Sequence, residues 1–263
     1  MHFTKMHGLG NDYLYIYGTV PDNAPELAKK LSDRHFGAGS DGLIYISPSA
    51  AADFKMRIFN ADGSEAKMCG NGIRCVGKYV FDKGYTDKKH LNIETLSGIR
   101  TLDLQASRGK VKAVSVGMGR AEVSEALTLE ADGSEVTGIP VSVGNPHLVI
   151  FVPDAARVPL TSLGPKLERH SAFPDGVNVE FVQALDRHTL RMRVWERGSG
   201  VTMACGTGAC AAAAAAVKLG VCPLDDEISV ALDGGSLKIS VTPDYAVTMT
   251  GPAEMIYEGE TVE

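Results

Sequence analysis

The sequence predicts an α+β fold with two pseudo-symmetric repeated domains, each a strand-rich layer wrapped around a central helix. Three observations predict it: the length of 263 residues, an internal repeat at a nearly constant offset, and the same order of short apolar runs in both halves. Single hydrophobic cores usually stop growing near ~250 residues, so two domains of about 130 residues each are favoured.

The internal repeat is clearest around two cysteines. Residues 56–74, MRIFNADGSEAKMCGNGIR, align without a gap with residues 192–210, MRVWERGSGVTMACGTGAC, at an offset of 136. Five of these nineteen positions are identical, where composition alone predicts about one. Upstream, GLGNDYLYI at 8–16 parallels SVGNPHLVI at 142–150 at an offset of 134. The agreement indicates two copies of one domain, and chance alignment of glycine-containing strings is the alternative.

Short apolar runs predict strands in the same order in both halves. The predicted strands are residues 13–18, 41–47, 54–60, 91–96, 101–106 and 111–118, then 147–152, 178–185, 190–196, 227–232, 237–241 and 246–251. Residues 25–35 are predicted to form a helix, and residues 159–170 form its counterpart. The junction between the halves is expected near Ala113. The expected domains are 1–113 with the tail 252–263, and 114–251.

Two further helices are predicted to begin at the cysteine motifs. Cys69 lies 15 residues before Gly84, and Cys205 lies 15 residues before Gly220. Both helices should therefore have one length and end at a glycine. The second contains an alanine run at 211–216. Alanine is the best helix former, and its small side chain permits close packing, so this run should be a buried helix.

The charge balance is moderately acidic, with 26 basic and 32 acidic residues. No cluster of Lys or Arg is long enough to follow a phosphate backbone, so nucleic acid is not an expected partner. The N-terminus has no apolar leader region, and the longest apolar runs fall far short of the ~18 residues that span a bilayer. We therefore expect a cytoplasmic protein without a membrane partner.

The five cysteines are an odd number in a long chain, which argues against a disulfide framework and favours reduced thiols. None forms a CxxC pair, and their spacings are not those of structural zinc sites, so no metal is expected. Cys75, Cys210 and Cys222 are interpreted as small buried hydrophobic residues.

The CGxG motifs of Cys69 and Cys205 point to chemistry. The first backbone N–H groups of a helix lack intrahelical partners, and the macrodipole places roughly +0.5 charge there. Glycines let an anion reach those donors. A cysteine at this position should have a stabilised thiolate, with a pKa of roughly 3.5 to 7.5 instead of about 8.5.

Two such units could direct both thiols at one substrate. A base on one face and an acid on the other can remove a proton from a tetrahedral carbon and return one to the opposite side. The helix starts would bind the substrate carboxylate and stabilise the developing negative charge. This arrangement predicts stereoinversion without a cofactor.

The chain resembles the diaminopimelate epimerase family. The matching motifs span nearly the whole chain: KMHGLGNDY at 5–13, NADGSEAKMCGNGIR at 60–74, GNPH at 144–147, GVNVEFV at 176–182 and ERGSGVTMACGTGA at 196–209. The resemblance implies the fold of that family and interconversion of LL- and meso-2,6-diaminopimelate without pyridoxal phosphate, in lysine and peptidoglycan precursor biosynthesis. It also implies a homodimer.

The resemblance further implies which residues act. Cys69 matches the proton donor and Cys205 the acceptor in the LL direction. The residues implied at the reacting carboxylate are Gly70, Asn71, Gly206 and Thr207. The other implied substrate contacts are Asn11, Asn60, Asn145, Asn178, Glu196 and Arg197.

Residue chemistry fits these implied roles. Arg197 can make two parallel charge-assisted hydrogen bonds to the carboxylate at the far end of the substrate. Glu196 can accept a hydrogen bond from the ammonium group at that end. His147 and Glu196 are also implied to support catalysis, with a structural histidine as the alternative for His147. Two positions depart from the family pattern: Gly42 stands where many members carry Gln, and Val201 where many carry Glu. They affect the expected substrate fit and leave the cysteine motifs intact.

Three other functions are compatible with these residues. One is a proline or hydroxyproline racemase of the same fold, which pairs two cysteines but has no use for a distal clamp. The others are a catalytically silent amino-acid-binding protein and a thiol redox sensor in which the two cysteines oxidise. A substrate panel and an isotope-exchange assay distinguish them.

Overall fold

The computed structural model describes residues 1–262. The chain forms two compact units, one of Met1–Val116 with the segment from Gly251 onward, and one of Gly117–Thr250. The boundaries expected from the sequence were 113/114 and 251/252. Both changes of unit fall inside strands, because β8 (Lys110–Arg120) and β18 (Ala246–Pro252) each continue past them.

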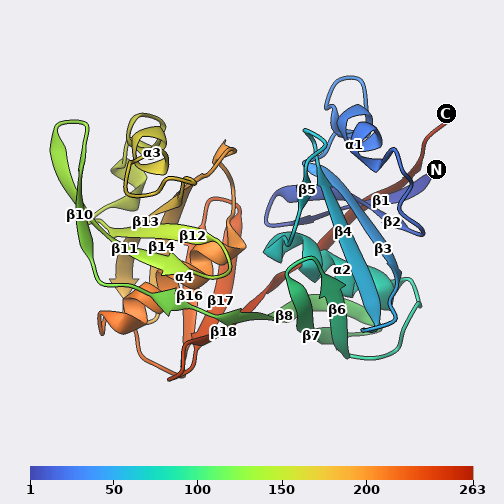
Figure 1. Ribbon diagram of the computed structural model, residues 1–263. Helices are drawn as coiled ribbons and strands as arrows, with labels where there is room; N and C mark the ends of the chain where they lie inside the picture. Colours follow the sequence, from blue (N-terminus) through green and yellow to red (C-terminus); the bar gives the residue numbers. More distant parts are fainter. Residues whose placement is uncertain (263) are drawn as a thin grey trace. The chain divides into compact units, whose positions relative to one another are not determined.

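The first unit consists of one strand-rich sheet and two helices (Figure 1). Besides β8, its elements are β1 (His2–Gly8), β2 (Asn11–Tyr17), α1 (Ala24–Ser32), β3 (Gly42–Pro48), β4 (Phe54–Asn60), β5 (Glu65–Ala66), α2 (Gly70–Asp82), β6 (His90–Thr95), β7 (Gly98–Ser107) and β19 (Glu254–Glu260). The strand order is β19-β1-β2-β3-β4-β6-β7-β8. Only the pairs β2–β3 and β4–β6 are parallel.

The second unit repeats this plan. Besides β18, its elements are β9 (Glu122–Val123), β10 (Leu127–Ala131), β11 (Ser134–Ser142), β12 (Pro146–Phe151), a short 3-10 helix (Ala155–Arg157), α3 (Leu160–Glu168), β13 (Asn178–Asp186), β14 (Thr189–Glu196), β15 (Gly200–Val201), α4 (Gly206–Lys218), β16 (Glu227–Leu232) and β17 (Gly235–Val241). The order is β9-β11-β12-β13-β14-β16-β17-β18, and only β12–β13 and β14–β16 are parallel.

The parallel pairs explain why each unit has two helices. A parallel connection must cross from one end of the sheet to the other, usually through a helix. Helices α1 and α3 make the first crossing in their units, and α2 and α4 make the second. The predicted fold class of two repeated α+β halves is therefore confirmed.

The predicted helices and strands are present, with small shifts at their ends. Helix α1 ends at Ser32, earlier than the predicted residue 35, because Asp33 leaves the helical conformation and its carboxylate accepts from the amides of His35 and Phe36. Strands β1, β10, β11 and β19 were not predicted. Polar side chains interrupt their apolar patterns, and pairing with neighbouring strands decides their conformation.

Helices α2 and α4 are the central helices of their units, as predicted (Figure 1). The alanines from Ala211 to Ala216 are fully buried, which confirms the buried helix. The predicted glycines, Gly84 and Gly220, lie two residues beyond the last helical residues, with φ angles of 77° and 70°. In each case the amides of the glycine and of the next residue donate to carbonyls of the last turn, at 2.9 to 3.1 Å.

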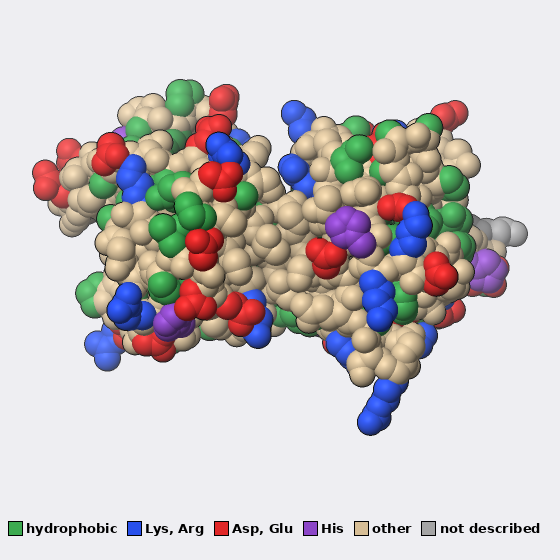
Figure 2. Space-filling view, turned by 90° about the horizontal axis from the view of Figure 1, so that it is seen from below, with side chains coloured by type: hydrophobic (Ala, Val, Ile, Leu, Met, Phe, Trp, Pro, Cys, Tyr) green, Lys and Arg blue, Asp and Glu red, His purple; other side chains and the backbone are tan. Residues whose placement is uncertain are grey.

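Charged side chains of both signs alternate over the surface shown in Figure 2. Several form exposed ion pairs, including Arg120 with Asp244 and Lys218 with Glu125. Such pairs contribute only about 0–1 kcal/mol each, so the fold depends mainly on the buried strands and central helices.

Candidate active site

Both cysteine motifs begin a helix in the same way. Cys69 and Cys205 are the N-cap residues of α2 and α4, with extended backbones. The Cys69 sulfur accepts from the amide of Gly72 at 3.3 Å, and the Cys205 sulfur accepts from Gly208 at 3.3 Å. The structure therefore confirms that each helix starts at its cysteine and places each sulfur on an otherwise unpartnered helix-start donor.

In the first unit, Cys69 is joined to a network of polar side chains. Its thiol donates to Asn11 Oδ1 at 3.3 Å, and Asn11 Nδ2 donates to Asp41 Oδ2 at 2.8 Å. Arg34 bridges Asp41 and Asp12, with N–O distances of 2.8 Å to each carboxylate. Lys5 lies 2.9 Å from the other oxygen of Asp12. The sequence indicated Cys69 and Asn11 as site residues, but not Asp41.

The Asp12 carboxylate stabilises the first unit in a pH-dependent way. Burial raises its pKa, but hydrogen bonds from Arg34 and Lys5 outweigh burial and leave the pKa below the ordinary value. A depressed carboxyl pKa gives stability that is fully present above the unfolded-state value, about 3.9, and is lost as the pH falls. We expect Asp12→Asn to reduce the free energy of unfolding most at neutral pH. In urea denaturation, the gap to wild type should narrow below about pH 4; a constant gap would contradict this.

The departure at Gly42 has a steric explanation. A Cβ at this position would lie 2.2 Å from the Phe59 carbonyl oxygen and 2.9 Å from a ring carbon of Tyr13. Burial raises the pKa of Tyr13 well above its usual value, and the nearby Cys69 and Asp41 add to this. The Tyr13 ring therefore lies where a larger residue 42 would need space, and its hydroxyl stays protonated beside Cys69.

In the second unit, a chain of polar contacts leads to Cys205. The Cys205 sulfur lies 3.6 Å from Thr207 Oγ1, and Asn145 Nδ2 donates to the same hydroxyl oxygen at 3.3 Å. Asn145 Oδ1 lies 3.0 Å from His147 Nε2. On the other side of the ring, His147 Nδ1 lies 2.7 Å from Glu180 Oε1, and both of these side chains are fully buried.

The expectation of a lowered thiol pKa is wrong for Cys205. Burial, the Glu196 carboxylate and the Glu180 carboxylate raise its pKa well above the ordinary value. Hydrogen bonds from Thr207 and the Gly208 amide act in the opposite direction but are weaker. The helix start alone does not set the pKa of Cys205, because desolvation and the negative charges of Glu196 and Glu180 disfavour the thiolate.

Glu196 is the titratable neighbour that contacts Cys205. Its carboxylate accepts from the Thr202 hydroxyl and is hydrogen-bonded to the Cys205 thiol. Burial raises the pKa of Glu196, and Glu180 adds to the increase. A carboxylate with a raised pKa beside a thiol is suited to receive that thiol's proton.

The remaining predicted residues lie in two other groups. Asn178 donates to the Pro146 carbonyl at 3.1 Å and accepts from the Arg197 amide at 2.9 Å, so it connects two backbone segments. The exposed Arg197 guanidinium donates to the Asp175 carbonyl at 2.8 Å. Asn60, at the end of β4, donates to Ser64 Oγ at 3.1 Å in the following turn. Gly70, Asn71 and Gly206 are buried in the first turns of α2 and α4.

Sequence reasoning missed Glu180, Asp41 and Thr202. Glu180 had a readable signal, because it interrupts the apolar run of residues 177–182 and a charged residue there is rarely buried without a partner. Asp41 and Thr202 had none, since their importance comes only from contacts with Asn11 and Glu196.

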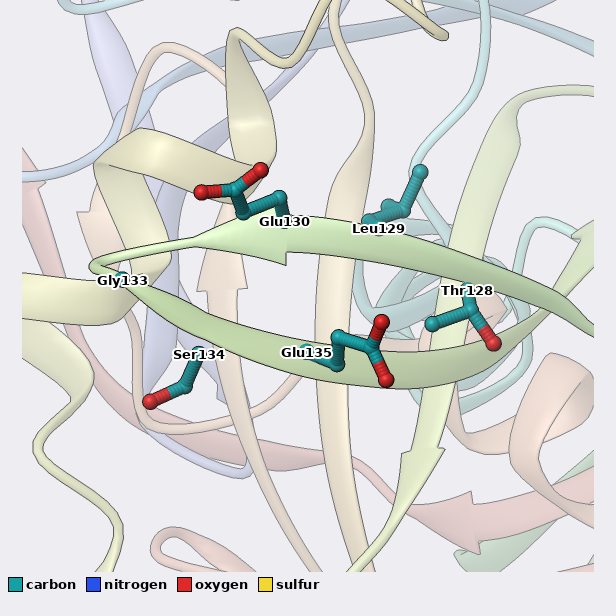
Figure 3. Close-up of a pocket in the computed structure, with 6 residues that line it drawn as sticks. All are labelled: Thr128, Leu129, Glu130, Gly133, Ser134 and Glu135. Carbon is teal, nitrogen blue, oxygen red and sulfur yellow. The ribbon is translucent and has the colours of Figure 1, made fainter.

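The hairpin of β10 and β11 carries a surface hollow lined by Thr128, Leu129, Glu130, Gly133, Ser134 and Glu135 (Figure 3). None of the predicted site residues lines it, so it is separate from the two cysteine groups. Within residues 1–262, no three His, Cys, Asp or Glu side chains are placed to hold a metal ion. No helix in that range is long and apolar enough to cross a membrane.

Solved structures share this fold at low sequence identity. A probable proline racemase from Agrobacterium radiobacter matches with a TM-score of 0.77 at 16% identity, covering 99% of this chain and 92% of that one. A phenazine biosynthesis protein of the PhzF family from Bacillus anthracis matches with a TM-score of 0.79 at 16% identity, covering 100% and 99%. These matches support the two-unit fold.

The fold and the sequence relatives define a pyridoxal-phosphate-independent amino-acid racemase or epimerase. The family model for diaminopimelate epimerase matches residues 3–124 and 139–256, one segment in each half. Diaminopimelate epimerases from Acetivibrio thermocellus and Phocaeicola vulgatus are 51% and 52% identical, covering 99% and 98% of this chain and 98% and 97% of theirs. The chain belongs to the diaminopimelate epimerase family, which confirms the resemblance.

Proposed function

We propose that this chain interconverts LL- and meso-2,6-diaminopimelate in lysine biosynthesis, with Cys69 and Cys205 exchanging protons with the α-carbon. Membership of the diaminopimelate epimerase family supports the reaction. The single structural observation that carries the mechanism is the matched N-cap position of the two sulfurs. No other cysteine caps a helix within residues 1–262.

Cys205 becomes a base by passing its proton to Glu196. The raised pKa of Cys205 keeps it a thiol in the resting enzyme, and the raised pKa of Glu196 suits that carboxylate to accept a proton. The resulting thiolate accepts hydrogen bonds from Thr207 and Gly208 and removes the α-proton, so that the sulfur is again a thiol and the carbon a carbanion.

Cys69 then completes the inversion as the acid. In the resting first unit its thiol hydrogen is donated to Asn11 Oδ1, so the proton is present on the sulfur. Transfer of that proton to the opposite face of the carbanion yields the epimer and leaves a Cys69 thiolate, which accepts from the Gly72 amide. The resting enzyme is restored when the Cys69 thiolate takes a proton from water and Glu196 releases its proton to water. In the reverse direction the Cys69 thiolate is the base and the Cys205 thiol is the acid, in accord with microscopic reversibility.

The helix starts would hold the carboxylate beside the reacting carbon. The first turn contains Gly70 and Asn71 in one unit and Gly206 and Thr207 in the other. The backbone N–H groups of a first turn lie at the positive end of the helix dipole, where they can bind an anion. Negative charge that moves from the α-carbon into the carboxylate during deprotonation is stabilised by such preorganised donors. No cofactor is required for this delocalisation.

The distal end of the substrate provides a test of specificity. Arg197 is exposed, and its guanidinium is held by the Asp175 carbonyl, which leaves other N–H groups for a carboxylate. We expect Arg197→Met to raise KM for diaminopimelate about 10- to 100-fold, the range of one or two charge-assisted hydrogen bonds, with a smaller effect on kcat. Steady-state kinetics in both directions measure this. A change in kcat alone would contradict a role in distal binding.

The proposed reaction is tested by isotope incorporation. In deuterated water with LL substrate and no added cofactor, the meso product should acquire one deuterium at the inverted carbon. Proline and hydroxyproline serve as competing substrates, because a solved structure of this fold is a hydroxyproline epimerase. Exchange with these ring substrates and none with diaminopimelate would favour the racemase alternative. Binding without exchange would favour a silent binding protein.

We also propose that the enzyme acts in the cytoplasm as a homodimer. Both parts of this proposal rest on membership of the diaminopimelate epimerase family. Light scattering of the purified chain measures the mass, and a monomer at working concentration would contradict the dimer.

A further inference from the structure

Asn11 and Asn145 are equivalent in the repeat, but their amides are fixed by different partners. Asn11 Nδ2 donates to the Asp41 carboxylate at 2.8 Å, which turns Oδ1 toward Cys69. Asn145 Oδ1 faces His147 Nε2 at 3.0 Å, which turns Nδ2 toward the Thr207 hydroxyl. Each asparagine therefore presents a different end toward the cysteine side of its unit.

Asp41 leaves Asn11 only one orientation. An ionised carboxylate accepts hydrogen bonds and cannot donate them. Asp41 already accepts from the Asp12 amide at 3.0 Å and pairs with Arg34 at 2.8 Å. If the Asn11 amide were reversed, two oxygens would face each other across a distance of about 2.8 Å. The NH2 group must therefore face Asp41, and the carbonyl oxygen must face Cys69.

The orientation of Asn11 has a chemical consequence for Cys69. A carbonyl oxygen can only accept, so it stabilises the thiol, whose hydrogen it receives, and disfavours the thiolate. The reversed amide would donate N–H to sulfur and would have the opposite effect. Tyr13 and the Gly72 amide are donors to this sulfur. The Asn11 oxygen accepts the thiol hydrogen and so favours the protonated sulfur.

We propose that Asp41 is a positioning residue for Cys69: its carboxylate fixes the Asn11 amide so that the Asn11 oxygen holds the Cys69 thiol hydrogen and keeps this cysteine ready as the proton donor. The proposal rests on the function proposed above, in which Cys69 is the acid in the LL direction. Asp41 does not contact the sulfur in this assignment, and its positioning effect is exerted through Asn11.

The Asp41→Asn variant should reverse the Asn11 amide. Arg34 donates to Oδ1 of residue 41 and would keep the oxygen of the new side chain there. The new NH2 group would then replace Oδ2, face Asn11 and give up the hydrogen bond from the Asp12 amide. Asn11 would then accept from residue 41 and donate to the Cys69 sulfur. We expect the midpoint pH of Cys69 ionisation to fall by about one unit or more, a tenfold change, as for one hydrogen bond to a charged group.

The midpoint can be measured from the ultraviolet absorbance of the thiolate in the full chain, with Cys205→Ala present in every variant and Cys69→Ala subtracted. Tyr13, Tyr15 and Cys75 are titratable groups that interact with Cys69, and they are unchanged throughout. Asp53→Asn is the matched control, because Asp53 also pairs with a cation and accepts a backbone amide in the same unit. It should leave the Cys69 midpoint unchanged.

Loss of the Asp41 charge would lower the midpoint without any turn of the amide, so the Asn11→Leu background separates the two effects. With no amide to turn, Asp41→Asn should then shift the midpoint by less than half of its effect in the Asn11 chain. An equal shift in both backgrounds, or no shift in either, would overturn the proposal. These titrations contain no substrate, so their result is independent of the turnover test of the proposed function.

If a variant fails to fold, the orientation of the Asn11 amide can still be measured by nuclear magnetic resonance in the chain with native Asp41 and Asn11. The Asn11 NH2 protons should show a nuclear Overhauser contact to the Asp12 amide proton, because both groups donate to Asp41 Oδ2. A reversed amide would instead show contact to the Gly72 amide, which donates to the Cys69 sulfur. Observation of that second contact would overturn the proposal.

Discussion

Replacing either Cys69 or Cys205 by alanine is expected to lower kcat in both directions by about 10²- to 10⁴-fold, the range that a positioned acid or base contributes. Each direction uses one sulfur as the base and the other as the acid, so neither variant keeps a complete pair. The unchanged helix start should still bind the substrate carboxylate, and KM should change much less than kcat. Deuterium incorporation at the inverted carbon measures the chemical step directly.

Cys222→Ala is the control for loss of a thiol. Cys222 is buried beyond the end of α4 and has no part in either cysteine group, and burial raises its pKa. This variant should keep wild-type turnover. If Cys69→Ala and Cys205→Ala also keep it, the two-thiol mechanism is wrong.

The second large effect is expected on stability, at the buried pair of His147 and Glu180. Both side chains are fully buried with a contact of 2.7 Å, and Glu180 Oε2 accepts no hydrogen bond within residues 1–262. His147→Leu removes the partner and leaves a buried carboxylate, which should cost about 3–5 kcal/mol in the free energy of unfolding. Chemical denaturation measures this cost.

The double variant His147→Leu/Glu180→Ile should recover most of that loss, because apolar replacement of a whole buried pair is often neutral or stabilising. The first unit supplies the precedent. A Cβ on Gly72 would meet Ile44 at 2.7 Å, and a Cβ on the equivalent Gly208 would meet Glu180 at 2.7 Å. The first unit therefore has an apolar residue, Ile44, at the position that Glu180 occupies in the second unit. A double variant as unstable as His147→Leu would show that the pair is needed for folding.

The same double variant should lose turnover although it folds. The chain from Glu180 through His147, Asn145 and Thr207 ends at the Cys205 sulfur, and the double variant removes its first two members. Retention of wild-type kcat would show that this chain has no part in the reaction.

Much of the fold could be predicted from the amino-acid sequence. The repeat offsets of 134 and 136 predicted two like halves, and local patterns predicted the four helices because capping, glycine stops and apolar periodicity act over a few residues. The cysteine motifs located both helix starts. Strands such as β1 and β19 could not be predicted in this way, since their pairing with each other joins residues about 250 positions apart.

The sequence by itself determined the repeated α+β fold, the family and the two cysteine positions, because each is written in contiguous motifs. Only the tertiary structure decided the electrostatic character of each sulfur. Glu180 and Glu196 raise the pKa of Cys205, while Asp41 orients Asn11 at Cys69. These residues come from separate strands and loops, and charge interactions depend on distance and burial in space, which local sequence patterns do not encode.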